Sequence, residues 1–383
     1  MIYILKGKNN MKKEFTKDDT LFIKGIAIIM MLLHHLFRNQ SLFSNYQVSF
    51  FPLTLNFVME LTTIFKICVS IFAFLTGYGL YKAIIKEKID DHKSIKNWYI
   101  NRVFKTLSGF WIIAIIAFIV CQIIDGETFN FYFKGDILYG IIRMIVELLG
   151  MGKLIFNAVF SGPWWYMSIA VLFILSAPIF VRLFNKYGYT KVLLIVIFLP
   201  RVIGWNFVDN SYIAFLFPFL LGIIFSKENI IIKLSNYVII KKNKYLNLIT
   251  KLIIETLIII LLYRISVVVD AKFLWELKYG IFPALLICYL FEFFSSIPLI
   301  KNVLRFLGKH SMNIFLIHWI VAQKYLREYI YSYKNFLKIF LALLIISLVI
   351  SIAIELLKKL ICYEKLINKF KNKIQKLSDS VIN

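Results

Sequence analysis

Apolar runs long enough to cross a membrane recur along the whole chain, separated by short polar and basic breaks. A membrane-spanning helix needs about 20 mainly apolar residues, and the strict alternation typical of a membrane β-barrel is absent from the sequence. The pattern therefore predicts an all-α, polytopic membrane helical bundle of about ten transmembrane helices. The expected spans are residues 21–37, 62–81, 106–124, 163–184, 191–208, 211–226, 247–263, 279–296, 304–322 and 336–357.

One apolar segment, residues 137–150, does not fit this series. It is short and carries both Arg143 and Glu147. Charged positions and short length suit the membrane interface, so we expect an interfacial or re-entrant helix there.

The distribution of Lys and Arg predicts the orientation of the bundle. Basic residues concentrate before the first span, after the second span, in alternate loops from there on, and after the last span. Basic loops stay on the cytoplasmic side, so we expect both termini inside. The predicted organisation is a cytoplasmic segment over residues 1–20, a single membrane domain over 21–357 and a basic cytoplasmic tail over 358–383.

The amino-acid composition supports a membrane protein and affects how the net positive charge is interpreted. Hydrophobic residues make up 60% of the chain and aromatic residues 17%, whereas the formal net charge is +24. In a soluble protein such a charge would suggest nucleic acid, but here it fits cytoplasmic loops attracted to anionic headgroups. We therefore expect the lipid bilayer of the cell membrane as the partner, no nucleic acid, and leave self-association open.

The first predicted span, residues 21–37, holds three ionisable side chains in one apolar run. An ionisable group in a membrane span is costly, so by default it marks a functional site. At 100° per residue, Lys24 and His35 lie within about 20° of each other on the helix and ~16 Å apart along its axis, whereas His34 points about 80° away from Lys24. Imidazole exchanges protons near neutral pH, so His35 is a candidate general base. A structural role, with both histidines bonded to a neighbouring helix, is the alternative.

A second cationic pair precedes the third span. Arg102 and Lys105 are one helical turn apart and present two cations on one face, which suits the phosphates of a nucleotide-type carrier. An ordinary cluster of cytoplasmic basic residues is the alternative. Arg201, next to Pro200, and His318, in the ninth span, are candidates for orienting an acceptor. No spacing of His, Cys, Asp or Glu predicts a metal site.

Six stretches in chain order resemble membrane-bound acyltransferase family 3, the integral-membrane O-acyltransferases of surface polysaccharides. The first span resembles the family's opening helix, with Lys24 in place of its usual Arg and His35 at its essential histidine. The others are SIFAFLTGYGLYKA, KNWYINRVFKTLSGFW, GPWWYMSIAVLFILSAPIF, FLFPFLLGIIFS and RFLGKHSMNIFLIHWIV. Lysine keeps the charge of arginine but lacks its bidentate fork.

The resemblance implies an O-acyltransferase, in the simplest case an O-acetyltransferase, that acts on a cell-surface polysaccharide or its precursor. Acyl-coenzyme A is the implied co-substrate, with no bound cofactor. Its phosphates are expected at Arg102, Lys105 and Lys24, with His35 and Lys24 as the catalytic pair. Thr76, Trp165 and Tyr166 lie in matching stretches and join Arg201 and His318 as candidate acceptor or orienting residues.

A secondary transporter or flippase is the rival interpretation, in which the ionisable groups of the bundle form a polar path. Transporters often carry internal repeats and broken spans in matching positions. Neither is visible in this sequence, so the enzyme is the favoured hypothesis.

Overall fold

The computed structural model describes residues 14–89, 91–204, 211–269 and 274–380. Every regular element in these ranges is a helix, and the one β-type contact among them is an isolated bridge between Ser49 and Asn335. The predicted all-α class is thus confirmed. Contacts divide the chain into a first unit (Met1–Lys82, Ile179–Ser311 and Tyr331–Leu341) and a second unit (Ala83–Pro178, Met312–Ile330 and Ala342–Asn383).

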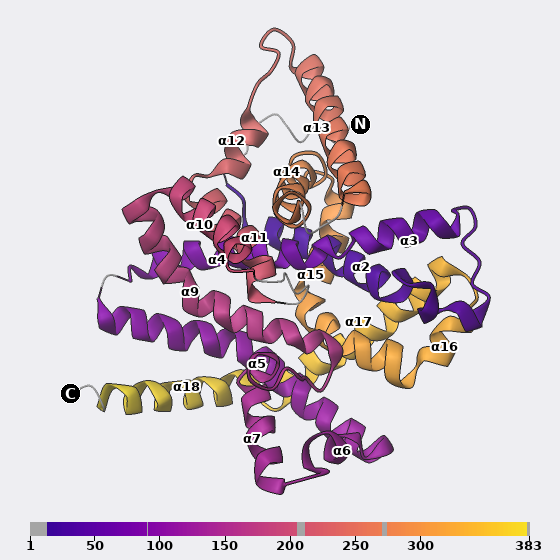
Figure 1. Ribbon diagram of the computed structural model, residues 1–383, viewed down its shortest axis with the longest axis vertical. Coiled ribbons are helices and arrows are strands. Elements are labelled where there is room, and N and C mark those ends of the chain that lie inside the picture. The colour runs from indigo at the N-terminus through magenta and orange to yellow at the C-terminus, as the bar shows by residue number, and fades with distance from the viewer. Residues whose placement is uncertain (1–13, 90, 205–210, 270–273, 381–383) are drawn as a thin grey trace. The chain divides into compact units, whose positions relative to one another are not determined.

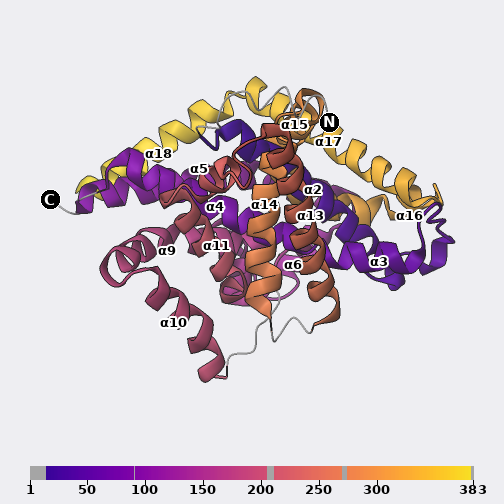
Figure 2. The same ribbon diagram turned by 90° about the horizontal axis from the view of Figure 1, so that it is seen from above.

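The first unit contains the N-terminal helices and most of the middle of the chain. Its elements, coloured from indigo to orange in Figure 1, are α2 (Lys17–Phe37), η1 (Gln40–Leu42), η2 (Ser44–Tyr46), α3 (Leu55–Ile64), most of α4 (Ile67–Glu87), α10 (Tyr189–Val202), α11 (Tyr212–Lys227), α12 (Ile230–Asn236), α13 (Lys244–Val268), the π-helix η4 (Leu277–Ile281), α14 (Phe282–Phe293) and the first part of α15 (Pro298–Trp319). Helices α13 and α14 run side by side (Figures 1 and 2).

The second unit is built on the longest helix, α5 (His92–Asp125). Its other elements are α6 (Glu127–Phe133), α7 (Ile137–Leu148), α8 (Gly152–Phe156), η3 (Gly162–Trp164), the first part of α9 (Trp165–Tyr187), the π-helix η5 (Ile320–Tyr325), most of α16 (Arg327–Tyr331) and of α17 (Phe336–Leu360), and α18 (Tyr363–Ser380). Helix α18 lies alongside α5 in both views (Figures 1 and 2).

Glycines let two helix pairs of the first unit approach backbone to backbone. A Cβ atom on Gly25 of α2 would lie 2.0 Å from the Leu304 carbonyl oxygen of α15, and one on Gly308 of α15 would lie 1.9 Å from the Leu21 oxygen of α2. Helices α4 and α11 form the same kind of contact: a Cβ atom on Gly77 would lie 2.0 Å from the Phe219 oxygen, and one on Gly222 would lie 2.0 Å from the Phe74 oxygen. Close approach through small residues is the usual way to pack membrane helices, so these contacts fix the helix that carries Lys24 and His35.

Charged groups hold the start of α2 against α15. Thr16 and Asp19 form a capping box, which satisfies backbone N–H groups of the first turn. Asp19 also accepts from Lys301 at 2.7 Å, and Asp18 from Arg305 at 2.7 Å. The register between α2 and α15 is therefore set by ion pairs at one end and by glycines further along.

Aromatic rings form the core of the second unit. Phe118 packs edge-on against Phe160 at 5.0 Å and against Tyr132 at 5.4 Å, and Phe110 meets Trp164 at 5.0 Å. Such pairs contribute about 0.5–1.5 kcal/mol each beyond the area that they bury.

The segment predicted at 137–150 forms α7 over Ile137–Leu148, and its apolar side chains are exposed where those of a soluble helix would be buried. Ile137, Leu138 and Ile141 are exposed, whereas Glu147 is buried. The predicted helix is confirmed, and its exposed apolar face suits lipid or the membrane interface, although its depth stays a prediction.

Six helices among the described residues are long and apolar enough to cross a membrane, or seven if the bent pair α11 and α12 forms one span. The count of ten and the inside position of both termini stay predictions, and the expected span 191–208 runs into residues 205–210, outside the described ranges. Two predicted boundaries are wrong: residues 55–61 and 92–105, taken as loops, belong to α3 and α5. The Asp91 carboxylate accepts from the Ser94 N–H and so caps the N-terminus of α5. The helix therefore starts at His92, well before the apolar run begins.

Candidate functional site

The two adjacent histidines of α2 have different surroundings. His34 is buried, and its Nδ1 lies 2.8 Å from the Thr62 carbonyl oxygen, to which it donates a hydrogen bond. Its Nε2 lies 3.4 Å from Arg38. His35 is half-buried and meets the His34 ring edge-on at 5.2 Å. His34 therefore serves the contact between α2 and the end of α3, and His35 is the better candidate for chemistry.

Lys24 is half-buried on the same helix as His35. Lys24 is next to Gly25, which meets the Leu304 backbone of α15, so the backbone that carries Lys24 has little freedom to shift. His35 lies ten residues further along the same helix. A fixed backbone is the arrangement that a positioned catalytic side chain requires.

Two other candidates of the first unit are engaged in the structure. The Thr76 hydroxyl donates to the Phe72 carbonyl oxygen at 2.8 Å, within its own helix. Arg201 forms a bidentate pair with Glu276, with nitrogen–oxygen distances of 2.8 and 2.7 Å. Any contact of these groups with an acceptor would have to share or replace these bonds.

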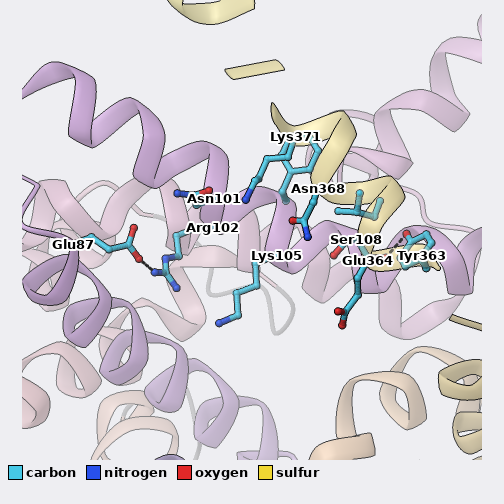
Figure 3. Close-up of a pocket in the computed structure, with 11 residues that line it drawn as sticks. Glu87, Asn101, Arg102, Lys105, Ser108, Tyr363, Glu364, Asn368 and Lys371 are labelled. Atoms are coloured by element: carbon cyan, nitrogen blue, oxygen red, sulfur yellow. Dashed lines mark hydrogen bonds and ion pairs between the residues drawn. The ribbon is translucent and has the colours of Figure 1, made fainter. Parts of the chain in front are cut away.

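Arg102 and Lys105 line a pocket of about 430 Å³ in the second unit (Figure 3). Its lining residues come from the end of α4, from α5 and from α18: Glu87, Asn101, Arg102, Phe104, Lys105, Ser108, Tyr363, Glu364, Ile367, Asn368 and Lys371. Three cations, two carboxylates and two amide side chains thus surround one cavity. One of the carboxylates, Glu87, pairs with Arg102, and the excess of cations suits an anionic group.

Arg102 is held by an ion pair and by a ring contact. Its guanidinium pairs with Glu87 and lies 6.0 Å from the centre of the Trp98 ring, one turn earlier on α5. Its Nε atom is buried and has no hydrogen-bond partner among the described residues. A buried donor without a partner is costly, so a ligand that displaced its surroundings and accepted from this nitrogen would gain a hydrogen bond. Lys105, by contrast, is exposed.

Helix α18 closes the other side of the pocket. The Tyr363 hydroxyl donates to the Ser108 carbonyl oxygen at 2.7 Å, and Phe370 packs against Phe104 at 5.5 Å. Lys96 pairs with Asp379 near the far end of the helix. Burial raises the pKa of Tyr363 to about 12. A tyrosine is already protonated at neutral pH, so this shift extends the pH range over which the hydroxyl donates.

The remaining candidates, His318, Trp165 and Tyr166, also lie in the second unit. His318 is fully buried, and its Nδ1 lies 2.8 Å from the Phe315 carbonyl oxygen of its own helix. Tyr166 packs edge-on against Phe315 at 5.8 Å and against Trp165 at 5.8 Å. The structure thus brings His318 and Tyr166 to the same phenylalanine.

Sequence reasoning missed several residues of these sites. Trp164, the neighbour of Trp165, is buried and donates from its indole nitrogen to the Leu316 carbonyl oxygen at 2.9 Å. The pocket residues of α18 were assigned to a basic tail, although Tyr363, Ile367 and Lys371 recur at a spacing of four residues, which indicates one helix face. Among the described residues, no group of three or more His, Cys, Asp or Glu side chains is placed to hold a metal ion.

The fold and its apolar helices define a multi-pass helical membrane protein. The profile of the acyltransferase domain of family 3 matches residues 22–356, which is most of the chain, so the protein belongs to this acyltransferase family. No curated protein and no solved structure matches the chain. The match includes Lys24, His35, Arg102 and Lys105, but ends before α18.

Proposed function

We propose that the protein is an O-acyltransferase of the cell membrane that transfers an acyl group, most simply acetyl, from cytosolic acyl-coenzyme A to a hydroxyl group of a surface polysaccharide or its precursor. Family membership over residues 22–356 supports the acyltransferase class. The observation that carries the donor assignment is the cationic pocket at Arg102 and Lys105. Coenzyme A is a polyanion, and its phosphates suit a guanidinium with an unused donor.

His35 is the proposed general base. Its neutral imidazole takes the proton of the acceptor hydroxyl as the oxygen attacks the thioester carbonyl carbon. The carbon–sulfur bond then breaks, the imidazolium returns the proton to the leaving thiolate, and an ester and coenzyme A are released. His34 does not take this role, since its Nδ1 is used by the Thr62 carbonyl.

The other residues have supporting roles in this proposal. Lys24 supplies a cation on the helix of the base, for the donor phosphates or for negative charge that develops during attack. His318, Trp165, Tyr166, Thr76 and Arg201 are the proposed acceptor or orienting residues. The bilayer and the glycan are the expected partners.

The test compares His35→Ala with His34→Ala in membranes that contain the natural glycan, using labelled acetyl-coenzyme A. Loss of a general base costs about 10²–10⁴-fold in rate, so we expect His35→Ala to abolish both label transfer and release of free coenzyme A. His34→Ala should lower the amount of folded protein and retain transfer per folded molecule. Full transfer by His35→Ala would contradict the proposal, and uptake of donor or glycan into vesicles without thioester cleavage would favour a transporter.

A further inference from the structure

Helix α18 carries a lysine on the face that contacts α5. Tyr363, Ile367 and Lys371 are half-buried and line the pocket, one turn apart, whereas most of the other side chains of α18 are exposed. A helix that only packs against a neighbour places apolar residues on that face. The position of Lys371 therefore needs a reason other than packing.

No carboxylate of the described chain pairs with Lys371. Arg102, in the same pocket, does have such a partner in Glu87. Lys369 and Lys373, elsewhere on α18, resemble Lys371 in that no carboxylate of the described residues pairs with them, but they do not line this pocket. In Figure 3, Lys371 extends from α18 toward the side of the pocket that holds Asn101 and Arg102. Two cations thus approach one cavity from two helices, and the Nε of Arg102 has no acceptor.

We infer that α18 forms the second wall of the donor-phosphate site, with Lys371 and Asn368 as phosphate ligands opposite Arg102. This inference rests on the proposed function, because it assigns the anion to coenzyme A. The pocket of about 430 Å³ is within the size range of small-molecule sites. Since α18 lies beyond residue 356, it adds to the site from outside the segment that the family shares.

The amide groups agree with a phosphate between the two helices. Asn101 of α5 and Asn368 of α18 line the same pocket, and each side-chain amide donates two hydrogen bonds. Ser108 contributes a hydroxyl. Glu87 keeps Arg102 oriented by the ion pair, so the guanidinium does not have to be ordered when the anion arrives.

The experiment measures the binding of coenzyme A to the full-length protein in lipid nanodiscs. Lys371→Gln is compared with Lys373→Gln, which removes the same charge from an exposed position of α18 outside the pocket. We expect binding about tenfold weaker for Lys371→Gln, within twofold of wild type for Lys373→Gln, and largely restored for Lys371→Arg. The control separates a specific contact from general attraction, which both glutamines weaken equally.

A second pair of variants tests the wall without changing charge. Asn368 lines the pocket and Asn372 does not, and both are exposed on α18. Asn368→Ala should weaken binding about threefold, and Asn372→Ala should not. Hydrogen exchange of α18 should be the same in all five variants of this helix, which excludes simple undocking as the cause.

The outcomes also separate this inference from the proposed function. If Arg102→Gln weakens binding and the variants at 368 and 371 match their controls, α18 is not part of the site and the donor proposal stands. If wild-type protein does not bind coenzyme A, both proposals fail.

Discussion

The two units bury charged side chains in different ways. In the first unit, Lys251 of α13 is buried and its ammonium group meets Glu292 of α14 at 2.6 Å, as well as the carbonyl oxygens of Leu234 and Ser235 at 2.9 and 3.1 Å. In the second unit, the buried Glu147 is held by neutral donors, the Tyr132 hydroxyl at 2.6 Å and the Phe160 N–H at 2.8 Å. Lys251 is thus stabilised by a carboxylate of opposite charge, whereas Glu147 is stabilised by neutral hydrogen-bond donors.

Their helix contacts differ in the same sense. In the first unit, glycines bring α2 against α15 and α4 against α11 at backbone distance. The second unit has one such contact among its described glycines, Gly140 of α7 against the Tyr132 carbonyl oxygen of α6, and its core is mainly aromatic. The unit that carries His35 is thus held by contacts that tolerate little displacement. The unit that carries the cationic pocket leaves a cavity between α5 and α18. This difference agrees with the proposed roles, in which His35 is a base held in place and the cationic pocket receives the donor.

The largest expected effect comes from breaking the buried ion pair of the first unit. Lys251→Met removes one charge and leaves Glu292 buried without it, which costs about 3–5 kcal/mol. Thermal unfolding of the purified protein in detergent should show a large loss. The double variant Lys251→Met/Glu292→Leu should recover much of it, because the fully buried carboxylate is removed with its partner and only the partly exposed Glu255 loses a contact.

Lys233→Met is the control for this prediction. Lys233 lies 3.8 Å from Glu228 in an exposed pair, and exposed pairs contribute about 0–1 kcal/mol. A loss as large as that of Lys251→Met would mean that removal of any lysine disturbs this unit. A double variant less stable than Lys251→Met would contradict the account of the buried pair.

A smaller effect is expected when the backbone contact of α2 is widened. Gly25→Ala places a Cβ atom 2.0 Å from the Leu304 oxygen, and overpacking costs about 1–3 kcal/mol. The variant should unfold at lower temperature and lose acyl transfer per folded molecule, since α2 carries His35. Gly79→Ala is the matched control, because its Cβ meets no atom within 4 Å. A destabilised Gly79→Ala would show that loss of glycine itself, not the contact, is responsible.

Much of this arrangement is predictable from sequence because it depends on local pattern. Apolar periodicity predicts the helices, and the placement of His34 and His35 on different faces follows from 100° per residue. Likewise, Arg143 and Glu147 mark 137–150 as an unusual helix. These features depend only on residues near one another in the chain.

The rest depends on partners that the chain brings from far away. In the sequence, Gly77 looks like any glycine of a membrane helix. Only the structure shows that a Cβ atom on Gly77 would lie 2.0 Å from the Phe219 carbonyl oxygen. Lys371 looks like one lysine among several in a basic helix, and the helix break between α3 and α4, at Phe65 and Lys66, has no Pro or Gly to mark it. Tertiary contacts decide all three, so local propensity does not predict them.

The smallest expected effect is a change of stability with pH that comes from Glu147. Burial raises the pKa of Glu147 above its ordinary value of 4.5, so the folded state holds this proton more tightly than the unfolded chain does. The stabilisation is complete below pH 4.5 and is lost as pH rises through the higher folded pKa. Glu147→Gln removes this titration, so the midpoint of thermal unfolding of wild type relative to Glu147→Gln should fall as pH increases from 4.5 toward neutral. Glu127→Gln, at a partly exposed carboxylate of the same unit that pairs with Lys324, should not reproduce this trend. A difference between wild type and Glu147→Gln that is flat with pH would mean that Tyr132 and Phe160 offset the burial of the carboxylate completely.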